Sequence, residues 1–428
     1  MKISKSIKEN SYAIYGLGLS GTSVHKFLKK RKVTKIFTWD DKKKFSSKKI
    51  NSFKTVLNKV DFIVISPGIN IKKTIFKSIL IRNKKKIITD LDLFYIQKLP
   101  VKTIVVTGTN GKSTTCKLIQ HVLKNNKMNV QLGGNIGKPI LDLKIKKNSI
   151  VIVEASSFQL FFSKFIKPNF AAILNITKDH LDWHGTIKNY QDSKFNIFAH
   201  QDNRDYALLN NQELIKKYKK KSFLGKLKII KKNAAENVFK KYIKNKYLSS
   251  KPNLENLSFV YKLSTILSIN KKVIFKAFNT FKGLPHRNEI FFKKQDVTFI
   301  NDSKATSFEA ARHALENNEN IFWIVGGLPK LGDNFNLKNV SKNIIKSYII
   351  GKHINYFKKQ IGSLTEFKLS LNLEAALKDI FNDLFLLKKK KATVLLSPAG
   401  ASYDQFNNFV ERGNHFKKLT FQYARKFK

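Results

Sequence analysis

The sequence contains a short run in which glycines, a lysine and hydroxyl side chains follow an apolar stretch, Val105-Val-Thr-Gly-Thr-Asn-Gly-Lys-Ser-Thr114. Its two glycines, Gly108 and Gly111, allow the backbone to curl so that its N–H groups face phosphate oxygens at a helix N-terminus. Lys112 would then contact the β- and γ-phosphates, and the Ser113 hydroxyl would bind Mg²⁺. The run therefore predicts an ATP-binding phosphate loop made of Gly108, Thr109, Asn110, Gly111, Lys112, Ser113 and Thr114.

Two further segments could supply metal ligands beside that loop. The apolar run 150–153 ends in the carboxylate of Glu154, and the cluster Asp179-His-Leu-Asp182 follows another strand-like stretch, 171–175. Hard cations such as Mg²⁺ prefer oxygen ligands, and the carboxyl ends of parallel strands meet at one edge of a sheet. An isolated glutamate at a strand end is about as often solvated as functional, and a lone histidine is more often structural. The clustering favours Glu154 and His180 as ligands.

A glycine-rich turn near the N-terminus also has the form of a phosphate cradle. Gly16-Leu-Gly-Leu-Ser-Gly21 follows a strand-like run, and Asp40 closes the next one about 20 residues later. The pattern fits a dinucleotide site, but a UDP-sugar would need the same N–H groups. Ser66-Pro-Gly68 adds a second tight turn after the third run.

The last third of the chain carries polar segments that also follow strand-like runs. These segments are Leu284-Pro-His-Arg287, Asn301-Asp-Ser-Lys-Ala-Thr306, Gly326-Gly327 with Lys330, and Ser397-Pro-Ala-Gly-Ala-Ser402. Arg287 and Lys304 are suited to phosphate or carboxylate, and Asp302 could accept a hydrogen bond from a ribose hydroxyl. Each alone could be a solvated loop charge, but together they indicate half of an active site.

Elements of strand length alternate with helix-length stretches along the whole chain, which predicts an α/β fold with parallel sheets. Pro100 separates the first series of strands from the second, and Gly283-Leu-Pro285 precedes the third. We therefore predict three domains, 1–98, 99–284 and 285–428. The Lys-rich stretch 210–251 has weak patterning, and there the sequence is uninformative. The expected strands are 12–15, 36–39, 62–65, 104–107, 150–153, 171–175, 298–301, 322–325, 347–350 and 393–397.

The composition limits the class of protein. With 42% hydrophobic residues among 428, the chain can bury substantial cores, which excludes a wholly disordered protein. It has no apolar run of the roughly 18 to 20 residues that a membrane helix needs. The first ten residues lack the apolar stretch of a signal peptide. The single cysteine, Cys116, suits a reducing compartment, so we expect a soluble cytoplasmic protein with no membrane span.

The net charge of +53, from 82 basic and 29 acidic residues, would attract nucleic acid, anionic lipid or phosphorylated substrates. Seven of the basic residues are Arg and 75 are Lys, and the Lys are spread along the whole chain. Nucleic-acid surfaces usually favour Arg as well, because its guanidinium binds phosphate and guanine with two hydrogen bonds. We therefore favour a Lys-coated enzyme without a specific nucleic-acid partner, and an A/T-rich coding bias as the origin of the lysines.

Taken together, these segments resemble the Mur ligases, the family that also includes the folylpolyglutamate synthases. The resemblance spans essentially the whole chain in motif order. It rests on the phosphate loop and on Glu154-Ala-Ser-Ser-Phe-Gln-Leu160, Leu284-Pro-His-Arg287, Asn301–Thr306 and Ser397-Pro-Ala-Gly-Ala-Ser-Tyr-Asp-Gln-Phe406.

The resemblance implies a Rossmann-like N-terminal domain that binds UDP, a central P-loop ATPase domain with a mainly parallel sheet, and a Rossmann-like C-terminal domain. It further implies that ATP drives amide formation between UDP-N-acetylmuramoyl-L-alanine and D-glutamate through an acyl phosphate, in the synthesis of peptidoglycan precursors. Two Mg²⁺ ions and a monomeric, cytoplasmic enzyme are part of the same expectation.

The resemblance also assigns roles by position in this sequence. Catalytic roles fall on Lys112, Glu154, His180, Lys194 and Lys304. The metal ligands are Ser113, Glu154, His180 and Lys194, the last of them as a carbamate. Further ATP contacts are Asn256, Arg287 and Asp302. The UDP-substrate contacts are Leu19, Ser20, Asp40, Ser66, Gly68 and Asn135. The D-glutamate contacts, beside Lys304, are Thr306, Lys330, Ser402 and Phe409.

Three positions depart from the family pattern, and three other functions compete with it. Pro252, Leu328 and Gly400 stand where a histidine, an acidic residue and a cysteine are usual. Another Mur-type ligase, including the folate branch, would differ in the C-terminal motifs. A basic nucleic-acid-binding ATPase would need an Arg/aromatic stripe or a helicase-like motif set, and we find neither. A plain NAD-binding module would leave most of the chain unexplained.

Overall fold

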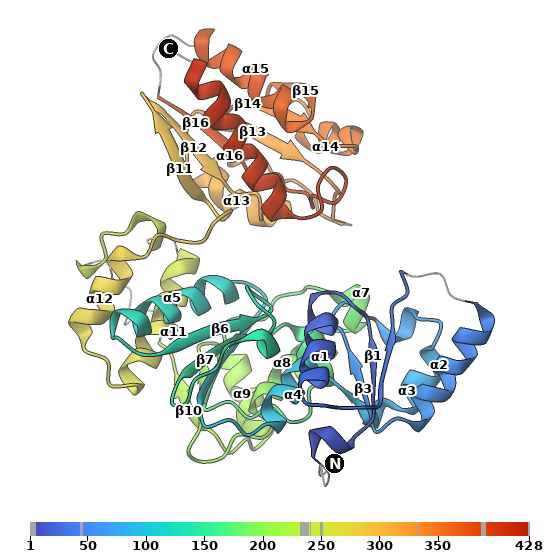
Figure 1. Cartoon of the computed structure of the whole chain (residues 1–428). Coiled ribbons are helices and arrows are strands. Elements are labelled where there is room, and N and C mark those ends of the chain that lie inside the picture. The colour runs from blue at the N-terminus through green and yellow to red at the C-terminus, as the bar shows by residue number, and fades with distance from the viewer. Residues whose placement is uncertain are drawn as a thin grey trace. The chain divides into compact units, whose positions relative to one another are not determined.

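The computed structural model describes residues 6–42, 46–231, 239, 241–248, 251–330, 332–386 and 391–426. The chain divides into two compact units, Met1–Phe281 and Lys282–Lys428. Among the described residues there are three sheets, two in the first unit and one in the second (Figure 1). The predicted α/β class with mainly parallel sheets is confirmed. The boundary expected at 98/99 falls inside the first unit and stays a proposal, as does the boundary at 284/285.

The first sheet has the strand order β2-β1-β3-β4, and all of its described pairings are parallel. Its strands are β1 (Tyr12–Tyr15), β2 (Ile36–Trp39), β3 (Phe62–Ile65) and β4 (Ile87–Ile88). The helices of this part are α1 (Leu19–Lys30), α2 (Ser47–Lys59), α3 (Lys77–Arg82) and α4 (Asp90–Ile96). β1 and β3 are buried along their whole length because helices cover both faces of a parallel sheet.

The second sheet has the order β10-β9-β8-β5-β7-β6 and is parallel throughout its described pairings. Its strands are β5 (Lys102–Thr107), β6 (Val130–Gly134), β7 (Ile150–Glu154), β8 (Phe170–Ile173), β9 (Tyr206–Leu209) and β10 (Lys226–Ile229). The helices are α5 (Lys112–Asn125), α6 (Ser157–Phe162), α7 (Leu181–His184), α8 (Ile187–Phe195), α9 (Gln212–Lys220), α11 (Lys251–Ile266) and α12 (Lys271–Thr280). β5, which leads into the phosphate loop, therefore lies between β7 and β8.

The second unit contains one mixed sheet of order β11-β12-β16-β13-β14-β15, in which only the described pairing of β11 with β12 is antiparallel. Its strands are β11 (Glu289–Lys294), β12 (Val297–Asn301), β13 (Ile321–Gly326), β14 (Ile344–Ile350), β15 (Phe367–Leu371) and β16 (Ala392–Leu396). Its helices are α13 (Phe308–Glu316), α14 (Ile354–Ile361), α15 (Leu373–Leu386) and α16 (Phe409–Lys426). The short 3₁₀ turns of both units are Ile7–Glu9, Ile71–Lys73, Lys84–Lys86, Ile140–Asp142, Asn196–Phe198, Lys246–Leu248 and Ser341–Asn343.

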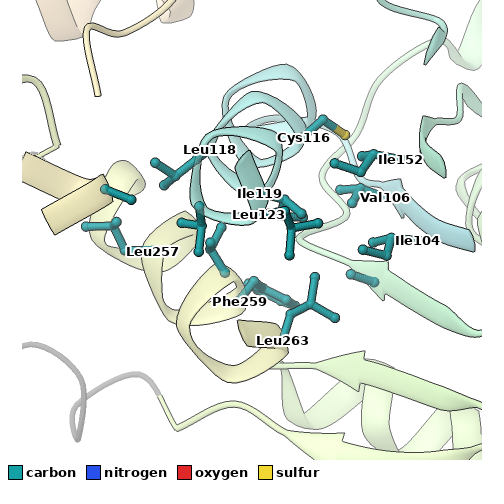
Figure 2. Close-up of a cluster of buried hydrophobic side chains, with 14 of the residues drawn as sticks. Ile104, Val106, Cys116, Leu118, Ile119, Leu123, Ile152, Leu257, Phe259 and Leu263 are labelled. Carbon is teal, nitrogen blue, oxygen red and sulfur yellow. The ribbon is translucent and has the colours of Figure 1, made fainter. Parts of the chain in front are cut away.

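An apolar core holds α5 and α11 against the second sheet. Figure 2 shows Ile104 and Val106 of β5 facing Ile119 of α5 and Phe259 of α11. α5 has a largely buried apolar side, and burial of that side, rather than its intrinsic propensity, stabilises the helix. The same core fixes the first turn of α5, and so the position of the phosphate loop.

Thr115 is a polar residue that faces this core. Its side chain is completely buried and lines a small apolar cavity between β5, β8 and α11, and its hydroxyl has no hydrogen-bond partner. An unsatisfied buried hydroxyl costs about 1–3 kcal/mol. We expect Thr115→Val to raise Tm by about 2 °C, measured by calorimetry, with unchanged nucleotide binding. Thr103→Val is the matched control: its hydroxyl accepts a hydrogen bond from the Asn169 N–H, so that variant should lose stability. A Tm fall in both variants would contradict the prediction.

Candidate active site

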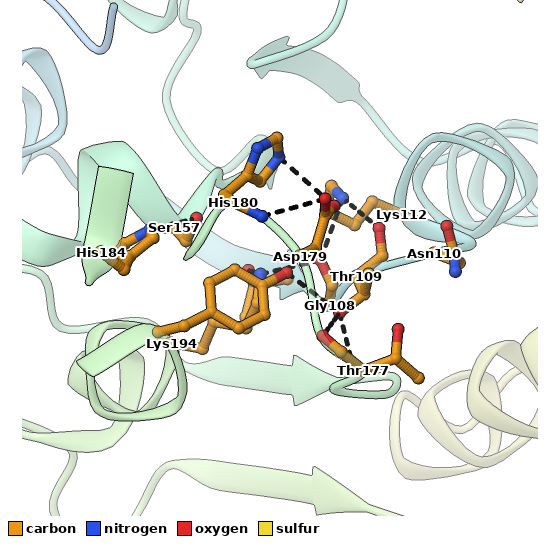
Figure 3. Close-up of polar contacts among 12 residues, drawn as sticks. Gly108, Thr109, Asn110, Lys112, Ser157, Thr177, Asp179, His180, His184 and Lys194 are labelled. Atoms are coloured by element: carbon orange, nitrogen blue, oxygen red, sulfur yellow. Dashed lines mark hydrogen bonds and ion pairs between the residues drawn. The ribbon is translucent and has the colours of Figure 1, made fainter. Parts of the chain in front are cut away.

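The phosphate loop lies between the end of β5 and the start of α5 (Figure 3). Gly111 has a φ of +83°, and a Cβ there would lie 2.3 Å from Oδ1 of Asn256. This position thus requires glycine both for its backbone and for the close approach of α11. The Lys112 ammonium donates to the carbonyl oxygens of Gly108 and Thr109 at 2.9 and 2.8 Å. The structure therefore places Asn256 of α11 against the loop that carries Lys112, and both residues are predicted ATP contacts.

Asn175, which follows β8, anchors the loop from the opposite side. Its carbonyl accepts from the Thr109 N–H at 2.9 Å, and its Oδ1 accepts from the Asn110 N–H at 2.8 Å. Its Nδ2 donates in return to the Asn110 carbonyl at 3.2 Å. The sequence analysis marked Asn175 only as a strand end. The partners of this clamp lie 65 residues away, so no local motif identifies it.

Glu154 ends β7 directly beside the phosphate loop, because β7 pairs with β5 through Val106. Its side chain is 2% exposed, and its Oε1 accepts a hydrogen bond from Nδ2 of Asn135 at 2.7 Å. Its Oε2 is buried and has no hydrogen-bond partner. A buried carboxylate oxygen without a donor fits a site for a hard cation, since such an oxygen is otherwise costly to bury. Asn135, a predicted UDP-substrate contact, thus touches the predicted metal ligand.

His180 is the N-cap residue directly before α7 and has a left-handed backbone conformation, with φ of +51°. Its N–H donates to Oδ1 of Asp179 at 3.0 Å, and its Nε2 lies 3.4 Å from Oδ2 of the same carboxylate. Its ring lies 4.7 Å from that of Phe158, centroid to centroid, and about half of the side chain is exposed. Figure 3 shows Asp179 and His180 beside Lys112 and Thr109. The half-exposed His180 imidazole therefore lies on the same side of the sheet edge as the phosphate loop, next to Asp179.

Lys194, on α8, is 1% exposed, and its side chain contacts the phosphate loop at Gly108. Its ammonium donates to the Gly108 carbonyl at 2.8 Å and lies 4.6 Å from the ring centroid of Tyr190. Lys112 donates to the same carbonyl oxygen. Burial lowers the pKa of Lys194 well below its usual range, and the nearby positive charge of Lys112 lowers it further. Within the described part of the chain, Lys194 is the lysine with a buried side chain, and none of its hydrogen bonds given by the structure is to a carboxylate.

His184, the last residue of α7, is a functional-site residue that the sequence analysis did not single out. It is 2% exposed, stacks on Phe158 at 5.7 Å between centroids, and has one ring nitrogen, Nε2, 3.0 Å from the Ser157 hydroxyl. Burial lowers the pKa of His184 to about 4, and the neighbouring His180 and Lys194 add to that effect. The imidazole is therefore neutral at pH 7. It packs against Phe158, the same ring that contacts His180.

The N-terminal glycine turn is held tightly against the neighbouring strands. A Cβ on Gly21 would lie 1.8 Å from the carbonyl oxygen of Gly16, so this position excludes every other residue. Asp40 accepts from the Leu17 N–H at 2.6 Å, and the Ser66 hydroxyl donates to the Gly16 carbonyl at 2.7 Å. The predicted UDP contacts Asp40 and Ser66 thus brace the turn. The remaining ones in this sheet, the exposed Leu19, the half-buried Ser20 and the exposed Gly68, lie on the two turns.

In the second unit, Asp302 lies at the end of β12 and is nearly fully buried. Its carboxylate accepts from the Ser397 hydroxyl at 2.7 Å and from the Asn288 N–H at 3.0 Å. Burial raises the pKa of Asp302 to about 7, and these hydrogen bonds and the charge of Arg287 oppose that rise. The structure therefore joins two predicted ATP contacts, Asp302 and Arg287, with the first residue of the segment 397–402.

A second group gathers around the start of α16. The Lys304 ammonium lies 4.6 Å from the ring centroid of Phe409, whose carbonyl accepts from the Ser303 hydroxyl at 2.9 Å. Arg412, which the sequence analysis missed, is 1% exposed; its guanidinium donates to the Ser303 hydroxyl and to the carbonyls of Ser303 and Gly400 at 2.8–3.0 Å. Burial lowers the pKa of Arg412 only to about 10, so it carries its charge at pH 7.

The other predicted D-glutamate contacts lie on the neighbouring loops. Thr306 and Lys330 are exposed after β12 and β13, and Ser402 is buried after β16. Leu328 forms backbone hydrogen bonds in both directions with Ala401, so that departure leaves the loop pairing intact. A Cβ on Gly400 would lie 3.1 Å from the ring of Phe357. The side chain of Pro252 lies outside the described part of the structure.

The comparisons with known proteins agree with these motifs. Residues 106–279 match the Mur ligase middle domain. A UDP-N-acetylmuramoylalanine–D-glutamate ligase from Rickettsia bellii is 32% identical over 443 residues, which cover 96% of this chain and 97% of the relative. One from Aquifex aeolicus is 33% identical over 423 residues, covering 95% and 98%. This chain belongs to the family of UDP-N-acetylmuramoylalanine–D-glutamate ligases. The resemblance to the Mur ligases is thereby confirmed, and the chain is an ATP-dependent ligase.

Solved structures of other Mur ligases share the fold. A MurF ligase from Thermotoga maritima in complex with ADP has a TM-score of 0.59 at 15% identity, covering 99% of both chains. The UDP-N-acetylmuramate–alanine ligase MurC from the same organism has a TM-score of 0.55 at 16% identity, covering 97% of this chain and all of that one. At such identities the likeness concerns the fold alone. Within the described ranges, no helix combines the length and the apolar character needed to cross a membrane.

Proposed function

We propose that this ligase joins D-glutamate to UDP-N-acetylmuramoyl-L-alanine in the cytoplasm, as a monomer, through an acyl phosphate. The observation that carries the proposal is the convergence of Lys112 and Lys194 on the Gly108 carbonyl, with the unpartnered Glu154 oxygen at the end of the adjacent strand. A phosphate loop with the Lys112 ammonium on it, beside a buried carboxylate that could bind a cation, suits the meeting of a nucleotide and a second anion. The names of the two relatives supply the identity of both substrates.

The first step activates a carboxylate, which is a poor acyl donor while its oxygen has no good leaving group. An oxygen of the alanine carboxylate attacks the γ-phosphorus of ATP, the P–O bond to ADP breaks, and an acyl phosphate forms. Lys112 and the loop N–H groups would offset the charge on the transferred phosphoryl group. Ser113, Glu154, His180 and a carbamate on Lys194 would hold two Mg²⁺ ions, which neutralise phosphate charge when bound.

The second step forms the amide bond. The amine of D-glutamate attacks the acyl carbon, and the tetrahedral intermediate expels inorganic phosphate as the amine loses its proton. Lys304, Lys330, Thr306 and Ser402 would bind the two carboxylates of D-glutamate through cations and hydroxyl donors. The partly buried Lys304, placed over the Phe409 ring, has less conformational freedom than a surface lysine.

Lys194 is the proposed site of carbamylation. Only a neutral amine reacts with CO₂, and burial together with Lys112 lowers the pKa of Lys194. A carbamate would also replace the repulsion between the two lysines with attraction. We expect ¹³C-bicarbonate to give a carbamate carbonyl signal in the NMR spectrum that disappears in Lys194→Arg. The exposed Lys188→Arg on the same helix is the control. A signal that survives in Lys194→Arg would contradict the assignment.

The direct test of the proposed function is phosphate release from ATP and Mg²⁺ with UDP-N-acetylmuramoyl-L-alanine present and candidate amino acids added one at a time. Release with D-glutamate alone, with the coupled product seen by mass spectrometry, is the expected result. Release with a different amino acid would keep the ligase chemistry and overturn the acceptor. A folded protein that binds ATP but releases phosphate with none of them would overturn the proposed reaction.

A further inference from the structure

A cluster of buried polar groups joins the first sheet to the second where β4 leads into α4. Asp90 and Asp92, in the first turn of α4, are 2% and 0% exposed. Neither forms an ion pair within the described residues. Two buried carboxylates without a cation are costly unless hydrogen bonds satisfy them. Their partners therefore indicate what the cluster does.

The carboxylate of Asp92 divides its two oxygens between the two sides of this junction. Its Oδ2 accepts from the N–H of Thr89, the residue after β4, at 2.8 Å and from the Thr89 hydroxyl at 3.2 Å. Its Oδ1 accepts from the N–H groups of Lys164 and Phe165 at 2.7 and 2.8 Å. These last two residues follow α6 of the second sheet. One side chain therefore ties the end of β4 to the end of α6.

Neighbouring contacts strengthen the same connection. The Thr89 hydroxyl lies 2.9 Å from that of Ser163, and Nε2 of Gln159 donates to the Asp90 carboxylate at 3.1 Å. The Lys164 ammonium donates to the Lys84 carbonyl at 3.0 Å. Phe162, at the end of α6, is buried in the apolar cluster of the first sheet. Polar and apolar contacts thus fix α6 against the first sheet.

α6 connects this junction with the active site. It begins three residues after Glu154, and its first residue, Ser157, contacts His184. The first sheet carries the predicted UDP turn at Gly16–Gly21. The distance between that turn and Glu154 therefore depends on how α6 is held.

We propose that Asp92 is a positioning residue of this ligase, which holds α6, and with it Glu154, in register with the UDP-binding turn of the first sheet. The inference rests on the proposed function, because it assigns the two aligned sites to the two substrates of one reaction. A carboxylate is needed because both of its oxygens accept hydrogen bonds. An asparagine would direct its NH₂ group at the N–H donors on one side and so break half of the connection.

The test compares full-length Asp92→Asn with Asp61→Asn. Asp61 is the matched control because its carboxylate accepts from the N–H and hydroxyl of Ser11 at 2.8 and 2.6 Å, and Ser11 belongs to the first sheet's part of the chain. We expect kcat, per nucleotide-binding site, to fall by about 10²-fold in Asp92→Asn, since small misplacements of reacting groups cost that much. The separately measured Kd values for UDP-N-acetylmuramoyl-L-alanine and for a non-hydrolysable ATP analogue should change much less than kcat, because the predicted UDP contacts other than Asn135 belong to the first sheet and the phosphate loop belongs to the second. Asp61→Asn should keep the wild-type kcat.

A second variant and a hydrogen-exchange measurement test the proposal if Asp92→Asn does not fold or the enzyme does not turn over. Ser163→Ala removes a single hydroxyl of the junction and should lower kcat less than Asp92→Asn does, so it serves if Asp92→Asn does not fold. In Asp92→Asn, hydrogen exchange should be faster than in Asp61→Asn either at the amide of 89 or at the amides of 164 and 165, on whichever side the asparagine NH₂ group faces. If the wild-type enzyme does not turn over with these substrates, the proposed function fails, and hydrogen exchange alone decides whether Asp92 holds α6. An unchanged kcat in a folded Asp92→Asn enzyme, or unchanged exchange at all three amides, 89, 164 and 165, would overturn the proposal.

Discussion

Replacing Lys112 with alanine should abolish phosphate release by this ligase. The Lys112 ammonium is held over the loop by the carbonyls of Gly108 and Thr109, where it would neutralise charge on the transferred phosphoryl group. Removing a single preorganised donor of this kind costs about 10²–10³ in kcat, and a full positive charge should cost at least as much. The measurement is steady-state phosphate release with both substrates saturating.

Lys124→Ala is the control for this variant because Lys124 lies on the same helix, α5, and is exposed. It removes the same charge from the protein without touching the loop, so its kcat should equal that of the wild type. Equal losses in both variants would show that total charge, rather than the ammonium at the loop, determines the rate. A Lys112→Ala enzyme with more than about a tenth of the wild-type kcat would contradict the assigned role, given the magnitude above.

Replacing Arg412 with methionine should damage both the stability of the second unit and the binding of D-glutamate. The guanidinium joins the loops that follow β12 and β16, through Ser303 and Gly400. Its removal leaves buried carbonyl groups unpaired, at about 1–3 kcal/mol each. We expect a loss of at least about 3 kcal/mol in the free energy of unfolding and a KM for D-glutamate raised about tenfold, since 1.4 kcal/mol of lost binding corresponds to tenfold. Calorimetry and D-glutamate titrations measure the two effects.

Arg425→Met is the matched control for Arg412→Met. Arg425 lies on the same helix, α16, but is exposed, and surface substitutions usually change stability by less than about 0.5 kcal/mol. The KM for ATP should change little in Arg412→Met, since the phosphate loop belongs to the first unit. A normal KM for D-glutamate in a destabilised Arg412→Met enzyme would show that the guanidinium serves the fold and not the acceptor site.

Much of the fold follows from the sequence because buried parallel strands leave a clear apolar signal. The strands 12–15, 36–39 and 62–65 occur with the predicted bounds, and the other expected strands are found within a few residues. β4 (Ile87–Ile88), β6, β9, β10, β11 and β15 were not predicted, and all of them except β9 lie at the edge of a sheet. β10, Lys-Leu-Lys-Ile, is a largely exposed edge strand with a single neighbour, and β11 pairs antiparallel at an edge where burial is partial. Edge strands need fewer apolar residues, so their pattern is weaker.

The residues of the candidate site also fall into two groups, those that a local sequence motif predicts and those that only the folded structure shows. The phosphate loop, the glycine turn at Gly16–Gly21 and Glu154 could be predicted as site candidates because each places its chemistry within a few consecutive residues. Asn175, Arg412 and Asp92 could not, because their contacts span 65, 109 and 72 residues of sequence. A buried arginine or aspartate in a helix has the same local pattern as a solvated one. Only the folded chain shows that these three side chains hold together the loops that the motifs supply.

The strand order of the two larger sheets has a consequence for synthesis on the ribosome. β5 pairs with β7 and β8, so the strand that carries the phosphate loop gains both neighbours only after residue 173 has been made. β12 and β13 are separated by β16, which is the last strand to emerge in the described part of the chain. Domains generally fold as units during translation, the N-terminal one first. The sheet that carries the phosphate loop can therefore form during elongation, whereas a nascent chain that stalls before residue 392 cannot complete the sheet that carries the proposed acceptor residues.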